Sequence, residues 1–362
     1  MKKIVIAVLA LCLLLSAIAA CGQNEGSTGV INDSPGEVVS SGVVNVHNWG
    51  EYIDQNIFKM FEEETGIRVN YSTFETNEAV YALLRRGGAS VDVIIPSDYM
   101  IARMIDEDML EELDFSNIPN FELIDERYKG LDYDPDDKFS VPYMTGTVGL
   151  IYNSAMITDE ITSWGALFDE RYSGQILMFD NPRDAFAIAL KYLGHYINTI
   201  NEDEIHEAYD LLVSQRPILQ AYVMDQIFDK LESGEAWIGP YYAGDFLVMV
   251  ENNPDLAFAR PVEGTNFFVD AMCIPKDTEN KTNAELFINF MSRTDIALMN
   301  MEYIMYASAN AEAAAEFANL IEPWQYEIMF ASDSVLANSE VFTHLPRNIL
   351  ELYDQLWVEL KR

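Results

Sequence analysis

The order of secondary-structure patterns between residues 43 and 95 constrains the fold more than any other feature of the chain. Apolar strand patterns alternate with amphipathic helical patterns, and they cover residues 43–47, 55–64, 68–74, 77–86 and 91–95. Thr76 before the second helical pattern and Gly66 after the first are typical of helix boundaries. A strand–helix–strand–helix–strand order favours a largely parallel sheet covered by helices on both faces. The sequence therefore predicts an α/β fold.

A second α/β series follows, and the length of the chain favours two lobes. Strand patterns cover residues 147–152, 176–178, 236–238 and 267–274, and helical patterns cover residues 185–193, 202–213, 225–233, 283–291, 295–303 and 349–360. If a leader of 20 residues is removed, 362 − 20 leaves 342 residues. This length is large for a single hydrophobic core.

The first residues predict an export signal. Lys2 and Lys3 precede an apolar stretch at residues 4–15, and Ile18-Ala19-Ala20-Cys21 resembles a bacterial lipobox. The resemblance implies that residues 1–20 are removed and that Cys21 carries lipid. The apolar stretch is shorter than the roughly 20 residues that a spanning helix needs. Residues 21–42 are rich in Gly, Ser, Asn and Glu, which predicts a flexible tether.

Net charge argues against nucleic acid as a partner. The formal charge is −37, and it becomes −39 without Lys2 and Lys3, since 20 basic then face 59 acidic residues. Such a chain repels a polyanion, whereas its field attracts small cations.

No metal or cofactor is predicted. Cys12 and Cys21 lie in or beside the leader, so Cys273 is left without a disulfide partner, and its apolar flanks predict a buried side chain. His47 lies in an apolar strand pattern and is interpreted as structural. No histidine pair has metal-ligand spacing, and the chain lacks a Gly-rich phosphate loop and a serine nucleophile motif.

Aromatic residues and carboxylates recur together where strand patterns end or within them. The instances are Trp49-Gly50-Glu51-Tyr52, Ser97-Asp98-Tyr99, Tyr241-Tyr242-Ala243-Gly244-Asp245 and Phe267-Phe268-Val269-Asp270. Ligands of open α/β sheets bind beyond the carboxyl ends of the strands. Aromatic faces attract cations and carboxylates pair with them, so the recurrence predicts a pocket for an organic cation.

These segments, in their order and spacing, resemble the substrate-binding proteins of polyamine (spermidine/putrescine) ABC importers, which are periplasmic binding proteins. The likeness runs from residue 43 to 361 and includes Tyr71-Ser72-Thr73-Phe74-Glu75-Thr76-Asn77-Glu78, Val141-Pro142-Tyr143, Ser163-Trp164 and Tyr172-Ser173-Gly174. It implies a two-lobed type II fold of mixed, largely parallel sheets with hinge strands between the lobes. On this basis we expect lobe 1 at residues 43–146 plus 270–309, and lobe 2 at residues 147–269 plus 310–362.

The resemblance also assigns roles to single residues. Aromatic or polar walls are implied at Trp49, Tyr52, Ser97, Tyr99, Tyr242, Phe268 and Tyr306, with Tyr241 as the competing alignment for Tyr242. Asp270 is the implied principal anchor for an amine, and Asp245 and Asp184 are rival second anchors. Asn181 stands where relatives usually carry an aspartate. Asp184 is equally interpreted as the cap of a helix starting at residue 185, while Glu51 and Asp98 are expected to be solvated or turn-forming carboxylates at the rim.

The predicted function is capture of polyamines, putrescine or spermidine or both, between the lobes and delivery to an ABC importer. The implied partners are the permease subunits, and the lipid on Cys21 would hold the protein at the outer face of the cytoplasmic membrane. No enzymatic activity is expected. One alternative is a receptor of the same fold for iron, thiamine, a sugar or an amino acid, in which Tyr241 and Tyr242 would suit iron. A second alternative is a secreted hydrolase using paired carboxylates such as Asp180 and Asp184.

Overall fold

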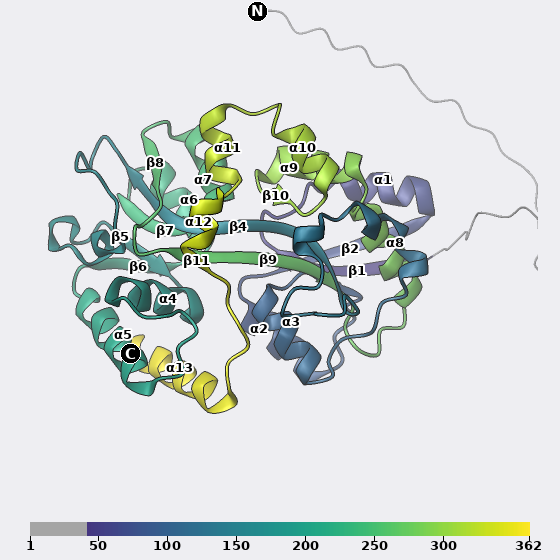
Figure 1. The fold of residues 1–362 in the computed structure, drawn as a ribbon, viewed down its shortest axis with the longest axis horizontal. Helices are drawn as coiled ribbons and strands as arrows, with labels where there is room; N and C mark the ends of the chain where they lie inside the picture. The colour runs from purple at the N-terminus through teal and green to yellow at the C-terminus, as the bar shows by residue number, and fades with distance from the viewer. Residues whose placement is uncertain (1–41) are drawn as a thin grey trace, which may run out of the picture. The chain divides into compact units, whose positions relative to one another are not determined.

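The computed structural model describes residues 42–362, which belong to one compact unit (Figure 1). The predicted signal at residues 1–20, the lipidated Cys21 and the tether up to residue 41 lie outside the described residues. Within residues 42–362 no helix is long and apolar enough to cross a membrane.

The first part of the sheet is parallel, as predicted. Strands β1 (Gly42–Trp49), β2 (Ile67–Phe74) and β3 (Val93–Ile94) pair in parallel, with β1 in the middle. They alternate with α1 (Asn56–Thr65) and α2 (Asn77–Arg86), and α3 (Asp98–Asp106) follows β3. Thr76 caps α2 by accepting a hydrogen bond from the amide of Ala79, and Gly66 ends α1 with a φ of 71°.

A second parallel group lies at the other end of the sheet. Here β5 (Ile176–Phe179) pairs in parallel with β6 (Leu219–Val223) and β7 (Ile238–Tyr242). The helices of this group are α4 (Pro182–Leu193), α5 (Glu202–Gln215), α6 (Gln226–Glu232) and α7 (Ala243–Asn252). The second α/β series of the sequence is therefore confirmed, although α7 has no counterpart among the predicted helices.

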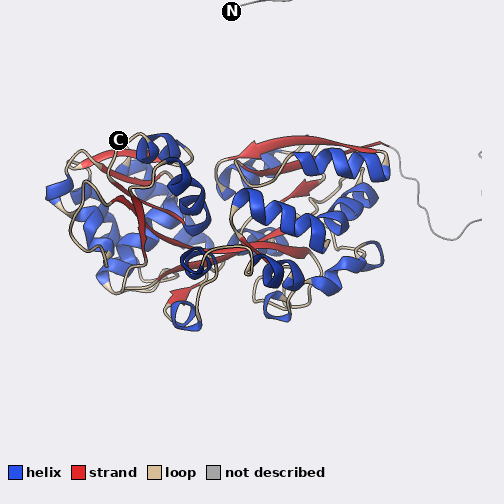
Figure 2. Cartoon of the chain, turned by 90° about the horizontal axis from the view of Figure 1, so that it is seen from above, coloured by secondary structure: helices blue, strands red, loops and turns tan. Residues whose placement is uncertain are grey.

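Two long antiparallel strands join the parallel groups. The sheet order is β2-β1-β3-β9-β4-β7-β5-β6, with β4 (Ser140–Asn153) and β9 (Thr265–Cys273) at the centre. β4 pairs with β9 up to Thr147 and with β7 from Val148 onward, so one strand contributes to both groups. Seen from above, the chain forms two groups of helices with strands running between them (Figure 2). The sheet is thus parallel at its flanks and antiparallel at its centre, as hinge strands require.

The remaining elements complete both groups. They are β8 (Leu256–Ala259), α8 (Lys281–Met291), α9 (Thr294–Ile304), β10 (Ala307–Ser308), α10 (Ala311–Phe317), α11 (Pro323–Met329), α12 (Asp333–Ala337), β11 (Ser339–Glu340) and α13 (Arg347–Leu360). Short 3-10 helices cover Phe115–Asn117, Pro119–Leu123, Glu126–Tyr128, Trp164–Phe168 and Glu170–Tyr172. Helix α10 packs on α9, and Asn310 donates to the carbonyl of Ser292. The predicted boundary after residue 309 therefore falls inside a packed unit, and the exact lobe boundaries stay a prediction.

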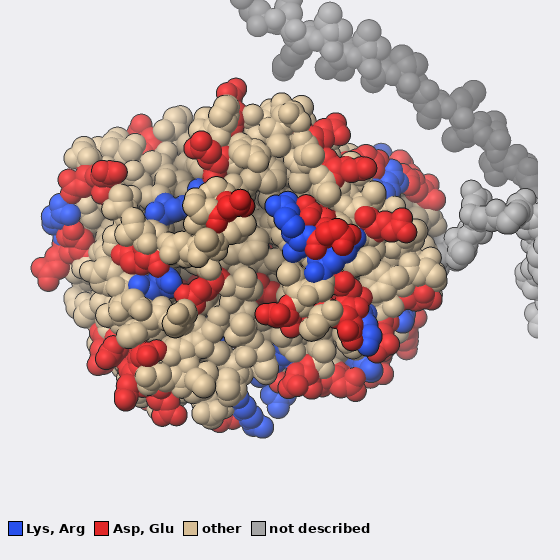
Figure 3. Space-filling model, viewed as in Figure 1, with Lys and Arg blue, Asp and Glu red and all other residues tan. Residues whose placement is uncertain are grey.

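Two single-residue expectations agree with the structure. Cys273 is a free, fully buried cysteine on β9. His47 is 9% exposed, its Nδ1 lies 2.9 Å from Ser72 Oγ, and burial lowers its pKa. Asp and Glu side chains are spread over the visible face and outnumber Lys and Arg there (Figure 3).

Candidate ligand-binding pocket

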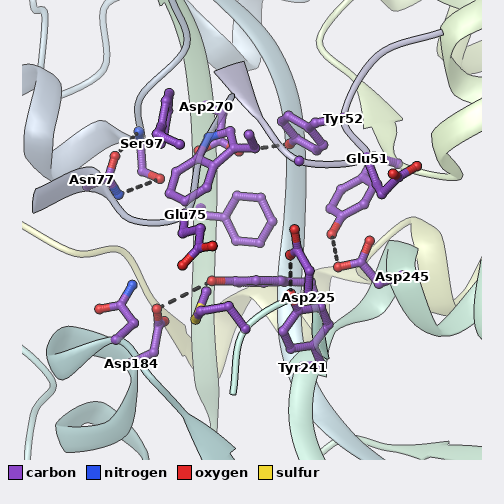
Figure 4. Close-up of a pocket in the computed structure, with 18 of the residues that line it drawn as sticks. Glu51, Tyr52, Glu75, Asn77, Ser97, Asp184, Asp225, Tyr241, Asp245 and Asp270 are labelled. Atoms are coloured by element: carbon purple, nitrogen blue, oxygen red, sulfur yellow. Dashed lines mark hydrogen bonds between the residues drawn. The ribbon is translucent and has the colours of Figure 1, made fainter. Parts of the chain in front are cut away.

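All ligand-binding residues predicted from the sequence line one pocket. These residues are Trp49, Tyr52, Ser97, Tyr99, Asn181, Asp184, Tyr242, Asp245, Phe268, Asp270 and Tyr306. They come from segments more than 250 residues apart in the chain, and several carboxylates among them point toward a common space (Figure 4). That they bind a ligand stays a prediction.

Sheet topology explains why the first segments meet. Because β1 and β3 are parallel neighbours, the residues that follow them lie at the same edge of the sheet. Trp49 ends β1, and its Nε1 donates a 2.8 Å hydrogen bond to the carbonyl of Ile95 beyond β3. Ser97 in turn forms an antiparallel bridge with Asp270 of β9. These contacts hold the wall residues of β1 and the α3 entrance beside Asp270.

Asp270 is a buried carboxylate with one oxygen left unpaired. Its side chain is 5% exposed, and its Oδ2 accepts a 2.8 Å hydrogen bond from the hydroxyl of Tyr52. Its Oδ1 is buried and has no hydrogen-bond partner within residues 42–362. Burial raises the pKa of Asp270 to about 6; the nearby Ser97 opposes this rise, although no hydrogen bond of normal geometry joins the two. An ammonium group at Oδ1 would supply the missing partner.

Asp245 lies in the first turn of α7 and is half-buried. Its Oδ2 accepts a 2.9 Å hydrogen bond from the hydroxyl of Tyr306 (Figure 4). Burial raises the pKa of Asp245 to about 8, and the negative charges of Asp225 and Glu51 add to the rise while the Tyr306 hydroxyl opposes it. The carboxylate form of Asp245 is therefore costly until a cation neutralises it.

Asn181, rather than Asp184, caps helix α4, and both residues line the pocket. Helix α4 starts at Pro182, and the side chain of Asn181 caps it by accepting from the amide of Arg183 at 3.0 Å. The interpretation of Asp184 as a cap is therefore wrong, because the helix begins earlier than predicted. Asp184 instead accepts a 3.4 Å hydrogen bond from Tyr242. Burial, then the charge of Glu78, raises its pKa to about 7, and the charge of Arg183 opposes this.

Arg183 provides a fixed cation beside Asp184 without lining the pocket. Its guanidinium lies 5.0 Å from the ring centroid of Tyr99 and 4.5 Å from that of Phe342. Its Nη2 donates a 3.1 Å hydrogen bond to Asn198. Such stacking on two rings holds the charge in place.

Aromatic rings form the walls through edge-on contacts. The ring centroids of Tyr52 and Tyr306 are 5.0 Å apart, and those of Tyr242 and Phe268 are 5.5 Å apart, both at nearly perpendicular angles. The centroids of Trp49 and Phe74 are 4.6 Å apart. Aromatic walls of this kind can contact both apolar methylenes and cations.

The rim interpretation of Asp98 is wrong. Asp98 is 1% exposed, and its two oxygens accept from the amides of Tyr99 and Val269 at 2.7 and 3.2 Å. These bonds join the start of α3 to β9, and burial raises the pKa of Asp98 to about 8. Glu51, by contrast, is exposed and lies in a turn with a φ of 46°, and it lines the pocket.

Sequence reasoning missed several lining residues. They include Phe74, Glu75, Asn77, Met224, Asp225, Phe228, Asn266 and Phe342. Glu75 belonged to a segment that carried the resemblance, whereas Asp225 was only the first residue of a predicted helix. No sequence signal marked Phe342, which lies in the C-terminal segment between β11 and α13.

This fold and pocket define the class of an extracytoplasmic solute-binding protein. A family model described as bacterial extracellular solute-binding protein matches residues 56–331, and the chain belongs to this family. The resemblance stated from the sequence is thereby confirmed.

Three similar proteins illustrate how the chain compares within the class. The chain is 35% identical over 270 residues to the spermidine/putrescine-binding periplasmic protein of Salmonella typhimurium, covering 74% of this chain and 77% of the relative. It is similar in structure to the spermidine/putrescine ABC transporter substrate-binding protein PotD of Streptococcus pneumoniae, with a TM-score of 0.74, 33% identity and coverage of 89% and 99%. The TpPotD lipoprotein of Treponema pallidum gives a TM-score of 0.78, 26% identity and coverage of 88% and 99%.

The structure disfavours two of the alternatives, the carboxylate-dependent hydrolase and the iron receptor. Asp180 pairs with Lys361 and does not line the pocket, so Asp180 and Asp184 do not face a common substrate space there. The hydroxyl groups of Tyr241 and Tyr242 donate to Asp225 and Asp184, and within residues 42–362 no cluster of three or more His, Cys, Asp or Glu side chains is arranged to hold a metal ion, which disfavours iron.

Proposed function

We propose that this protein captures a polyamine, putrescine or spermidine, in the pocket and delivers it to the permease subunits of an ABC importer. The single observation that carries the proposal is the charge of the lining. Within the described chain the pocket is lined by six carboxylates and by no Lys or Arg: Glu51, Glu75, Asp184, Asp225, Asp245 and Asp270. A pocket of this composition needs a cation to neutralise it.

The remaining lining suits the methylene chain of a polyamine. Aromatic rings surround the space between the carboxylates, and they can contact both methylenes and ammonium groups. Each partly desolvated cation–aromatic contact contributes about 0.5–2 kcal/mol. In our proposal Asp270 binds one ammonium group, Asp245 binds the second, and Asp184 is available to a third.

Closure of the lobes over the ligand follows from the way the strands cross. β4 pairs with β9 along one part and with β7 along the next. A bend in the backbone of these crossing strands would therefore move one parallel group relative to the other. We propose lobe 1 at residues 43–146 plus 270–309 and lobe 2 at residues 147–269 plus 310–362. Because α10 packs on α9, the boundary after residue 309 is the part of this assignment to revise.

A lipid anchor would place the pocket where a permease can be reached. We propose that Cys21 carries the lipid and holds the protein at the outer face of the cytoplasmic membrane. The lipobox-like residues 18–21 support this, and a relative of similar structure is described as a lipoprotein. Growth with a labelled fatty acid tests it: wild-type protein should take up label, and a Cys21→Ala variant should not.

Calorimetric titration of residues 22–362 tests the proposed ligand. We expect saturable binding of putrescine or spermidine, and none of thiamine or ferric ion. Absence of binding to every polyamine, with the protein folded by circular dichroism, would overturn the proposal.

A further inference from the structure

We propose that Asp225 is a further ligand-binding carboxylate, which acts with Asp245 on the same ammonium group. Its carboxylate occupies the space that a side chain at residue 50 would take, and Gly50 leaves that space open. This inference rests on the proposed polyamine function. It assigns a binding role to a residue that neither the sequence pattern nor the resemblance singled out.

The first observation is that Asp225 does not perform the local role its position offers. It is the N-cap residue of α6, where an aspartate ordinarily accepts a hydrogen bond from the exposed amides of the helix. No such bond forms here. The side chain turns into the pocket instead, where its Oδ1 accepts a 3.0 Å hydrogen bond from the hydroxyl of Tyr241 (Figure 4).

The second observation is the fit of the other oxygen against Gly50. A Cβ atom added at Gly50 would collide with Asp225 Oδ2, so this carboxylate oxygen fills the place of a side chain at residue 50. Gly50 is not among the glycines with positive φ, so its backbone conformation does not itself require glycine. The absent side chain at residue 50 is therefore explained by Asp225 rather than by backbone strain.

The third observation is that Asp225 lies close to other negative charge. The charges of Asp225 and Glu51 both raise the pKa of Asp245, and all three residues line the pocket. Oδ2 of Asp225 receives no hydrogen bond from the described residues. An ammonium group between Asp225 and Asp245 would convert their repulsion into two attractive contacts.

Gly50 offers a way to move the Asp225 carboxylate without removing its charge. In a Gly50→Ala variant the new methyl group must push Oδ2 away from its present place, whereas in an Asp225→Ala background the same methyl group meets no carboxylate. The two substitutions should therefore be non-additive. Asp229→Asn is the matched control, because Asp229 lies in the same helix, is exposed, and does not line the pocket.

The experiment is calorimetric titration of putrescine into the wild type, the single variants Asp225→Ala, Asp225→Asn, Gly50→Ala and Asp229→Asn, and the Gly50→Ala/Asp225→Ala double variant. We expect affinity to fall about tenfold in both Asp225 variants and about threefold or more in Gly50→Ala, with the double variant within about twofold of Asp225→Ala. Asp229→Asn should bind as the wild type does, and melting curves of the unliganded proteins check that each variant is folded.

Two results would overturn the inference while leaving the proposed function intact. One is wild-type affinity in both Asp225 variants. The other is a Gly50→Ala effect of equal size in the presence and absence of Asp225, since this would show that Gly50 acts through something else. A wild-type protein that binds no polyamine would instead overturn the proposed function on which the inference rests.

Discussion

The two ends of the pocket differ in where their positive charge comes from. At one end burial raises the pKa values of Asp184 and the neighbouring Glu78, and the positive charge of Arg183 partly opposes both rises. At the other end the charges that act on Asp245 are those of Asp225 and Glu51, and both raise its pKa. The first end therefore carries its own counter-ion, while the second depends on one from outside. We expect the second ammonium group of a diamine to bind at Asp245 rather than at Asp184.

The largest expected effect concerns Asp270, the proposed principal anchor, whose Oδ1 has no hydrogen-bond partner in the described residues. Asp270→Asn should weaken putrescine binding by more than about thirtyfold, or about 2 kcal/mol, because the buried anchor charge is lost. Calorimetry measures this, and Cys273→Ser on the same strand is the control for disturbance of β9. Unchanged affinity in Asp270→Asn would mean that the anchor is misassigned.

Acidity should weaken binding, because protons and ammonium groups compete for the same carboxylates. Burial raises the pKa values in the unliganded protein to about 6 for Asp270, about 7 for Asp184 and about 8 for Asp245. A polyamine stays charged over this range, so binding below these pKa values must release protons. With Asp270 and Asp245 as the two anchors, affinity should rise roughly twentyfold from pH 6.5 to pH 8 and level off above about pH 9. Titration in buffers of different ionisation enthalpy counts the released protons, and an affinity that falls as pH rises would contradict the assignment.

A direct comparison of the ends comes from Asp245→Asn and Asp184→Asn. The first should weaken putrescine binding about tenfold and the second less than about threefold, because Arg183 already compensates Asp184. Repeating both titrations with spermidine shows whether a third ammonium group uses Asp184. The comparison of the ends fails if Asp184→Asn is the more damaging variant for putrescine.

The smallest expected effect concerns the hydroxyl groups that hold the two rival anchors. Tyr306→Phe removes a 2.9 Å hydrogen bond to Asp245 and should cost about threefold in putrescine affinity. Tyr242→Phe removes a bond of 3.4 Å to Asp184 and should stay within about twofold of the wild type. If both variants lose the same affinity, the Asp245 end is not the preferred one.

Much of the site was predictable because parallel strands bring distant segments to one edge. The strand–helix order predicts the parallel sheet, and the pairing of β1 with β3 then brings Trp49, which ends β1, beside Ser97, which follows β3. Asp98 and Asp270 show the limit of that reasoning. Both are aspartates beside strand ends, yet backbone amides satisfy Asp98 while an oxygen of Asp270 is left unpaired in the pocket. This difference depends on how the start of α3 packs against β9, and these two elements lie far apart in the chain.

The sequence by itself determined the export-signal pattern, the α/β order, the class of solute-binding protein and the aromatic and acidic segments that meet in the pocket. Local patterns are enough for the signal, the α/β order and the aromatic and acidic segments, because periodicity is a property of neighbouring residues. The class came from the resemblance of these segments, in their order and spacing, to a known family. Only the tertiary structure decided that Arg183 lies beside Asp184 and offsets part of its charge. It also decided that the Asp225 side chain leaves the cap of its helix and lies against Gly50, and that Phe342 lines the pocket. Burial and charge pairing arise from contacts between distant segments, and no local pattern in the chain specifies which of its many carboxylates will lack a partner.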